Sequence, residues 1–475
     1  MLKLKTLILG ALAIALASCT AQSETPTYAQ RMVESHGLGD FYCNRHYQDS
    51  LSHTGWDYVS GLVANAVLKS WEQYPDKQCY YDAVKAFADF SLNEDGSFIS
   101  NTKGGNALRP SNIDDLPAGN IYFTLYRTEL EKGNTVDAER YKAAATMIRN
   151  KLKFDHSRIA PGLPGEGGFF HKAVYPNQMW LDGLFMGSPI YAQWQYNFGT
   201  GDEADNEASW SDIAHQFKTI HHYTYNPDVQ LNYHAWSATP EDPNSFWAQQ
   251  EGEYKGCSPE FWGRGMGWYF AALVDVLEFM PKEHADYEAV VKILNEVAAG
   301  LARWQDEESG VWYQLLQHDA TVKADNAGDT VEGKTFNIGE QPNYLEASAS
   351  CIFTYAYLKG IRLGLLDAAT YTPVAEKAYA GCVKEFIREM RLSAGLNEQR
   401  IEEAWTKVSG AGMYTLDIRY DKGVLYCTIN SSMVRNQLYF QKDVLVEALN
   451  EELQKDALLT WDWDKGPCVK SLVLR

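Results

Sequence analysis

The sequence lacks the short motifs by which several large classes of protein are recognised. It contains no Walker loop, no dinucleotide-binding glycine fingerprint, and no HExxH, GxSxG or EF-hand pattern. It also contains no CxxC pair and no spacing of Cys and His typical of a metal site. We therefore expect that the protein needs no metal ion and no cofactor.

Long apolar runs are missing beyond the N-terminus, so no later stretch is apolar enough to span a bilayer. Positive charge is also scarce, since the formal net charge is −20. This balance argues against a nucleic acid or an anionic membrane surface as partner, although a few cationic side chains could still bind a small anion. No protein partner is predicted. The 14 Trp and 29 Tyr residues are typical of proteins that stack and hydrogen-bond sugars, and core packing is the other explanation.

The N-terminus reads "MLKLKTLILGALAIALASCTAQ", with two lysines, an apolar run and then small residues. This order predicts a signal peptide over residues 1–18. Residues 16–19 resemble a bacterial lipoprotein box, which implies that Cys19 is lipidated and that residues 19–36 form a tether. We expect a protein anchored in the bacterial cell envelope, at the outer membrane facing the periplasm. An ordinary signal peptide with an incidental Cys19 is the alternative.

Seven cysteines remain beyond Cys19, an odd number that cannot all pair within one chain. Cys43 and Cys79 are the first pair to test for a disulfide, which an exported location permits. Cys351 and Cys382 fall in apolar helical stretches, so we expect both to be buried.

The rest of the chain follows a helical period. The predicted helices span 26–36, 53–74, 80–92, 119–131, 137–153, 176–198, 205–223, 261–280, 285–305, 344–364, 371–390 and 442–453. Short strand-like segments occur at 310–316 and 422–429. There is no βαβ alternation and no solenoid repeat, so the prediction is an all-α fold, an (α/α)6 barrel of helical hairpins with long rim loops, in a single catalytic domain over 37–475.

Unusual residue combinations sit in the long connections of this predicted fold, where functional loops are expected. "SNIDDLPAGN" places Asp114 and Asp115 just before a helix, and helix capping explains such acids as well as catalysis does. "VQLNYHAWSA" contains His234, which is either a hydrogen-bonded structural residue or a functional one.

"GEGGFFHKAVYPNQMWLDGLFMGSP" places Asp182 among apolar and aromatic residues, where a carboxylate is costly to bury. His171, Lys172 and Trp180 precede it, so the segment offers stacking, a cation and a proton donor for an acidic sugar. A helix start with Asp182 in its first turn is an equally good explanation from these residues alone.

"CSPEFWGRGMGWYF" places Arg264 between glycines at 263, 265 and 267 in an apolar helix. Each glycine costs a helix roughly 1 kcal/mol relative to alanine. Three of them suggest that another group passes close to this backbone, and Arg264 suggests that the group is anionic. The alternative is a buried Arg264 that pairs with Glu260 or another acid.

These segments, together with "YLEASASCIFTYAYLKGIRLG", closely resemble the unsaturated rhamnogalacturonyl hydrolases of glycoside hydrolase family 105. That family is related to the unsaturated glucuronyl hydrolases of family 88. The resemblance runs from about residue 53 to 390 and does not extend over residues 391–475. It implies an (α/α)6 barrel that removes a 4,5-unsaturated uronic acid from the non-reducing end of oligosaccharides made by polysaccharide lyases.

The resemblance also implies roles for single residues. The family's general acid/base aspartate, in its "MWLDG" motif, corresponds to Asp182, and a second active-site aspartate corresponds to Asp114. Pro117 stands where the family usually has Asn, so the contacts of that loop differ. The residues that correspond to substrate-binding positions are Tyr58, His171, Lys172, Trp180, His234, Arg264 and Trp268.

The implied substrate is unsaturated galacturonyl-rhamnose from rhamnogalacturonan. Three alternatives stay open: an unsaturated glucuronyl hydrolase acting on ulvan or glycosaminoglycan fragments, a non-catalytic sugar-binding lipoprotein, and an epimerase that uses His171 and His234. The sugar that follows the uronate would decide between the hydrolases.

Overall fold

The computed structural model describes residues 56–99, 108–322, 342–389, 393–456 and 466–475, with single positions or pairs at 330–331, 334–335, 459, 461 and 463. The chain divides into two compact units, one ending at His156 and one beginning at Ser157. The predicted signal peptide, Cys19, the tether and the predicted helix 26–36 lie outside the described residues. None of the helices in the described ranges is long and apolar enough to cross a membrane.

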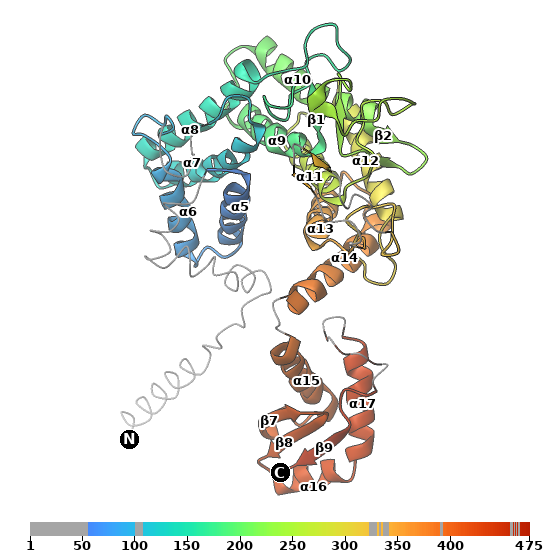
Figure 1. Ribbon diagram of the computed structural model, residues 1–475. Coiled ribbons are helices and arrows are strands. Elements are labelled where there is room, and N and C mark those ends of the chain that lie inside the picture. Colours follow the sequence, from blue (N-terminus) through green and yellow to red (C-terminus); the bar gives the residue numbers. More distant parts are fainter. Residues whose placement is uncertain are drawn as a thin grey trace, which may run out of the picture. The chain divides into compact units, whose positions relative to one another are not determined.

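The first unit consists of two helical hairpins (Figure 1). Its helices are α5 (Tyr58–Gln73), α6 (Gln78–Phe90), α7 (Ile121–Glu131) and α8 (Thr135–Asn150), followed by a π-helical turn at Lys151–Asp155. Two 3-10 turns, η1 (Ile113–Asp115) and η2 (Pro117–Asn120), lead into α7. A Cβ on Gly61 would lie 2.3 Å from the Cα of Ala118, so α5 packs directly against η2. The helices predicted in this region are confirmed.

The second unit begins with three more hairpins. They are α9 (Leu181–Asn197) with α10 (Glu203–Thr224), α11 (Gly263–Leu277) with α12 (Tyr287–Arg303), and α13 (Ala347–Arg362) with α14 (Ala368–Glu389). Helix α11 packs against both α9 and α13, and nearly all of its residues are buried. The predicted helices in this region are confirmed, apart from the beginning of the one over 176–198.

Residues 178–180 form a strand and not the first turn of that predicted helix. Strand β1 (Gln178–Trp180) pairs antiparallel with β4 (Ala235–Ser237), so that Trp180 lies opposite Ala235. The amide of Leu181 continues the pairing by donating to the carbonyl of His234 at 2.9 Å. Pairing with β4, which is distant in the chain, therefore outweighs the local helical pattern of residues 178–180. The remaining short pairs are β2 (Tyr225–Asn226) with β3 (Leu231–Asn232), and β5 (Thr330–Val331) with β6 (Lys334–Thr335).

Residues 393–475 form a small α/β arrangement with a three-stranded sheet, in the order β7-β8-β9. Its elements are α15 (Ser393–Ser409), β7 (Thr415–Asp421), β8 (Val424–Ile429), α16 (Ser432–Tyr439), α17 (Lys442–Gln454) and β9 (Ser471–Leu474). Strand β8 pairs antiparallel with β7 and parallel with β9. Alternate residues of β8, namely Leu425, Cys427 and Ile429, are buried with Trp405 in a core of their own. The predicted single domain over 37–475 stays a prediction, beside this local core.

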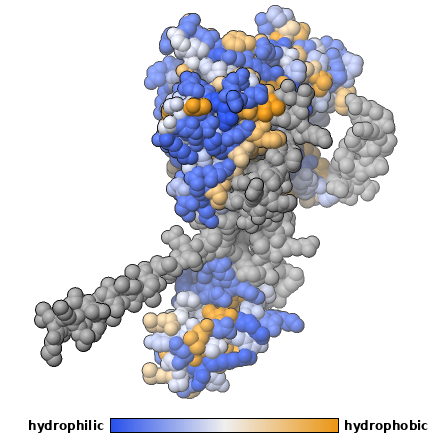
Figure 2. Space-filling view, turned by 90° about the vertical axis from the view of Figure 1, so that its left-hand side faces the viewer, coloured by the Kyte–Doolittle hydropathy of each residue, from blue (hydrophilic) through white to orange (hydrophobic). Residues whose placement is uncertain are grey.

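Some apolar side chains of residues 393–475 lie in this core, and others are exposed to solvent. Met413, Met433 and Phe440 are 81%, 76% and 87% exposed. The lower part of Figure 2 shows orange areas among hydrophilic surface, and the coloured surface of the upper part is mostly hydrophilic. The hydrophilic surface agrees with the formal net charge of −20.

Cys79 is disulfide-bonded, and its partner lies outside the described residues, as does Cys43. The described cysteines that form no disulfide are Cys257, Cys351, Cys382, Cys427 and Cys468. Cys382 is buried as expected. The expectation for Cys351 is wrong, because its position on α13 turns the side chain to the exposed side of that helix.

The local core predicts that a fragment of residues 393–475 folds by itself. We expect a cooperative thermal unfolding transition for this fragment, followed by far-ultraviolet circular dichroism. Trp405→Ala should lower its free energy of unfolding by about 3–5 kcal/mol, because Trp405 is completely buried. Leu416→Ala, at a position that is 69% exposed, is the control and should change little. A fragment without a cooperative transition would contradict the prediction.

Candidate active site

Asp182 lies in the first turn of α9, and the strand pairing described above brings His234 beside it. The Nδ1 atom of His234 is 3.3 Å from Oδ2 of Asp182, and both side chains are largely buried. Neither atom makes a hydrogen bond within the described residues. Buried polar atoms usually have partners, so a pair left open in this way is typical of a site that a ligand completes.

Burial lowers the pKa of His234, and the nearby carboxylate of Asp182 opposes this effect only in part. His234 is therefore a neutral imidazole at neutral pH. A neutral ring places no full positive charge beside Asp182.

Gly265 of α11 leaves the space in which His234 lies, and the neighbouring glycines lie against other groups. A Cβ on Gly265 would lie 2.6 Å from Nδ1 of His234, and one on Gly263 would lie 3.1 Å from the carbonyl oxygen of Tyr313. The close approach that the glycines predict is thus confirmed. The approaching groups are the protein's own imidazole and backbone, so the glycines themselves do not indicate an anion.

Aromatic rings surround the pair. The ring of Trp180 stacks in parallel with His171, at a centroid distance of 4.5 Å, and with Tyr175, at 5.1 Å. Trp180 also meets the edge of His234 at 5.3 Å, and its indole nitrogen donates to Gln178 Oε1 at 3.1 Å. The side chains of His171, Trp180, His234 and Asp182 therefore form one connected cluster. Lys172 lies next to His171 on the same loop and is partly buried.

Arg264 joins this cluster through Trp262. Its guanidinium lies 4.7 Å from the ring of Trp262, which in turn meets His234 edge-on at 4.8 Å. The nearest acid to Arg264 is Glu346, at 3.7 Å, and the side chain of Arg264 is 41% exposed. The buried pair with Glu260 is not formed, because Glu260 instead contacts His318 at 3.2 Å and Gln317. Trp268 is buried on the same helix and packs against Phe185 of α9 at 4.7 Å.

Sequence reasoning missed Tyr175, Trp262 and Glu346. Trp262 and Glu346 are the N-cap residues of α11 and α13. The predicted helices, 261–280 and 344–364, include both positions, so the apolar period did not mark either residue. Tyr175 carries no signal in the sequence either.

Asp114 and Asp115 are in the first unit, where they have different surroundings. Asp115 is completely buried, and it accepts hydrogen bonds from the backbone amide of Arg109 at 2.8 Å and from its guanidinium. This ion pair holds the pKa of Arg109 above its usual value. Asp115 is thus a structural acid that fixes the turn carrying Asp114, which is itself buried. Tyr58, at the start of α5, is partly buried in the same unit.

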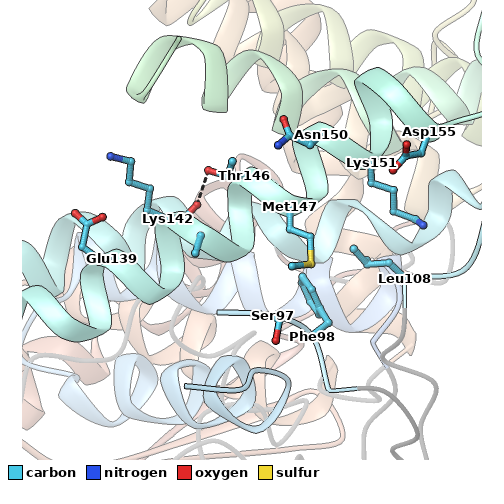
Figure 3. A pocket seen from close by; sticks show the side chains of 11 residues that line it. Ser97, Phe98, Leu108, Glu139, Lys142, Thr146, Met147, Asn150, Lys151 and Asp155 are labelled. Carbon is cyan, nitrogen blue, oxygen red and sulfur yellow. Dashed lines mark hydrogen bonds between the residues drawn. The ribbon is translucent and has the colours of Figure 1, made fainter. Parts of the chain in front are cut away.

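A cavity of about 770 Å³ also lies in the first unit, beside α8 (Figure 3). Met147 points toward Phe98 there, and the lining mixes apolar side chains with acids and lysines. None of the predicted site residues lines it. We therefore assign the active site from the Asp182 cluster, where an acid, a base and aromatic rings are in contact.

Among the described residues, no group of three or more His, Cys, Asp or Glu side chains is placed to hold a metal ion.

Comparison with known proteins decides the family. The model of the family described as Glycosyl Hydrolase Family 88 matches residues 38–328 and 335–403. The chain belongs to glycosyl hydrolase family 88. It is therefore a glycoside hydrolase, as its cluster of an acid with aromatic rings suggests. A second model, described as "Dna[CI] antecedent, DciA", matches residues 379–459 only.

Relatives of this family 88 member include the unsaturated rhamnogalacturonyl hydrolase YesR of Bacillus subtilis strain 168. The two are 24% identical over 361 residues, which cover 74% of this chain and 83% of that protein. A solved glycoside hydrolase from family 105 of C. acetobutylicum ATCC 824 is 33% identical, with a TM-score of 0.58, over 75% of this chain and 82% of that one. The predicted kinship with family 105 and the predicted (α/α)6 barrel are confirmed.

Because His234 packs against α11 at Gly265, a methyl group added at this position should reduce turnover, and one added at Gly267 should not. Gly265→Ala should displace His234 and reduce turnover of an unsaturated uronyl disaccharide about 100-fold, the cost of a displacement of roughly 1 Å in an active site. Gly267→Ala is the matched control, because its Cβ would meet only Ile352, at 3.3 Å. Gly267→Ala should leave the melting temperature the same or higher, since alanine favours a helix, whereas Gly265→Ala should lower it, because the new Cβ overpacks His234. Equal activity of the two variants would contradict the role of Gly265.

The contrast between Asp114 and Asp115 predicts a separation of stability from activity. Asp115→Asn should lower the free energy of unfolding by about 1–3 kcal/mol, because it leaves buried donors with a weaker acceptor. Asp114→Asn should lose activity, as measured by turnover of the same disaccharide, with thermal unfolding of both variants measured alongside. A large loss of stability in Asp114→Asn with normal turnover would reverse the two assignments.

Proposed function

We propose that this family 88 hydrolase removes a 4,5-unsaturated uronic acid from the non-reducing end of oligosaccharides produced by polysaccharide lyases. The observation that carries the proposal is the open pair of Asp182 and His234, enclosed by aromatic rings and connected to Arg264. The names of the relatives support it, since YesR is named an unsaturated rhamnogalacturonyl hydrolase.

The substrate of such an enzyme is a vinyl ether, which reacts by hydration. A proton adds to C4, and the positive charge then spreads between C5 and the ring oxygen. Water adds to C5 and loses a proton, and the resulting hemiketal opens and releases the next sugar. The enzyme therefore needs one group that first gives and then takes a proton, in contrast to the two carboxylates of glycosidases that act at the anomeric carbon.

Asp182 is the proposed proton donor, and as a carboxylate it then activates the water. Donation requires that Asp182 holds its proton when the substrate binds. His234 is neutral, so no imidazolium stands 3.3 Å from this carboxyl group.

Substrate binding is assigned to the side chains around this acid. Arg264 and Lys172 supply positive charge for the uronate carboxylate, and His171 and His234 supply ring nitrogens for its hydroxyl groups. We further propose Trp180, Trp268 and Tyr58 as substrate-binding residues and Asp114 as a second catalytic acid. These assignments come from the positions of the family motif.

Unsaturated galacturonyl-rhamnose from rhamnogalacturonan is the proposed substrate. A second candidate is an unsaturated glucuronyl unit from ulvan or glycosaminoglycans, because two relatives, from Alteromonas sp. and Formosa agariphila, are named unsaturated 3S-rhamnoglycuronyl hydrolases. We also propose that lipidated Cys19 anchors the protein in the cell envelope. Labelling with radioactive palmitate that disappears in Cys19→Ala would test the anchor.

The double bond of the substrate absorbs in the near ultraviolet and is lost on hydration, so turnover can be followed as a loss of absorbance. Wild-type protein should remove the near-ultraviolet absorbance of lyase products from rhamnogalacturonan faster than that of ulvan or glycosaminoglycan products. Asp182→Asn should abolish this loss while the melting temperature stays the same, because an amide cannot donate the proton. Near-normal turnover by Asp182→Asn would remove Asp182 from its role, and faster turnover of another lyase digest would reassign the substrate.

A further inference from the structure

Within the described residues, the guanidinium of Arg264 contacts polar groups through Nη1 alone. Nη1 donates to Oγ of Ser348 at 3.4 Å and lies 3.7 Å from Oε1 of Glu346. Nε and Nη2 donate no hydrogen bond to any described residue. The planar group rests on Trp262 and is 41% exposed. A carboxylate fits the open Nε–Nη2 edge with two parallel hydrogen bonds.

Glu346 is held rigidly beside this group. As the N-cap of α13, its carboxylate accepts from the amides of Ser348 and Ala349 and from the hydroxyl of Ser348, at 2.8 Å for the hydroxyl. Its side chain is only 10% exposed. The start of a helix thus fixes a negative charge at one side of Arg264.

Capping alone does not require this charge. Ser, Thr, Asn and Asp are the usual N-caps, and they are shorter than Glu. The longer side chain of Glu346 places Oε1 toward Arg264, and Arg264 is the cation paired with it among the described residues. Arg264 therefore accounts for the length of residue 346, while the negative charge suits both Arg264 and the start of α13.

We propose that Glu346 is a positioning residue: with Ser348 and Trp262 it holds Arg264 so that the Nε–Nη2 edge receives the uronate carboxylate, and this makes the enzyme select the free acid over its methyl ester. The inference rests on the proposed function. A methyl ester carries no charge and cannot offer two equivalent oxygens, so the ester loses the paired hydrogen bonds that the acid makes.

The location agrees with this role. Trp262, which supports Arg264, meets His234 at 4.8 Å, and His234 lies 3.3 Å from Asp182. A continuous series of side-chain contacts thus links the carboxylate-binding edge to the proton donor. Fixing Arg264 at one end fixes the sugar relative to Asp182 at the other.

The test compares an unsaturated uronyl disaccharide with its methyl ester, and measures the ratio of their kcat/KM values in the full-length protein. Glu346→Asp keeps the charge and a preferred N-cap, but it withdraws the carboxylate from Arg264 by one methylene. We expect the acid-to-ester ratio to fall at least about tenfold, through a higher KM for the acid, with little change in kcat or melting temperature. Glu346→Gln, which keeps the length and loses the charge, should give the same fall.

Two controls separate positioning from a structural role. Glu278→Asp shortens another acid between α11 and α13, which pairs with Lys359 at 2.6 Å, and should leave the ratio unchanged. Arg264→Met should lower the ratio, and adding Glu346→Asp to it should have no further effect, because Glu346 acts through Arg264.

An unchanged ratio in both Glu346 variants, or a Glu346 effect that persists in Arg264→Met, would overturn the inference while leaving the proposed function in place. A wild-type protein that leaves both disaccharides intact would overturn the proposed function, and this inference with it.

Discussion

The contact between His234 and the backbone of α11 at Gly265 is the constraint on which the active site depends. Three elements hold the imidazole: the β1–β4 ladder with its continuation at Leu181, the edge of Trp180, and the helix surface that lacks a Cβ. Burial from these sides keeps His234 neutral. The charge state of the ring beside Asp182 is thus set by packing.

The adjacent acids Asp114 and Asp115 have different surroundings. Asp115 accepts hydrogen bonds from Arg109, and these bonds hold the turn in place. The neighbouring Asp114 is carried on that turn, which α5 holds from the other side through the contact of Gly61 with Ala118. Asp115 does not cap a helix, because its carboxylate accepts from Arg109 and Asn112, and a catalytic role of Asp114 stays a prediction.

Much of the helical framework could be predicted from the sequence, because amphipathic period is a local property. The limits came from long-range contacts. Residues 178–180 are a strand because β4 pairs with them. Helices α15 and α16 were not predicted, and their apolar side chains pack into the small core around Trp405. Asp182, His234, Trp180 and His171 were correctly expected to be of interest, and they are in contact. Glu346 was missed because its importance comes from Arg264, on another helix.

The missing Cβ at residue 265 has an evolutionary consequence. A side chain there and an imidazole at residue 234 compete for the same volume, with 2.6 Å between a Cβ and Nδ1. A larger residue at position 265 is therefore expected only after His234 has been replaced. Once position 265 carries a side chain, a histidine at position 234 no longer fits. Loss of hydrolysis in a lineage with such a side chain would be difficult to reverse.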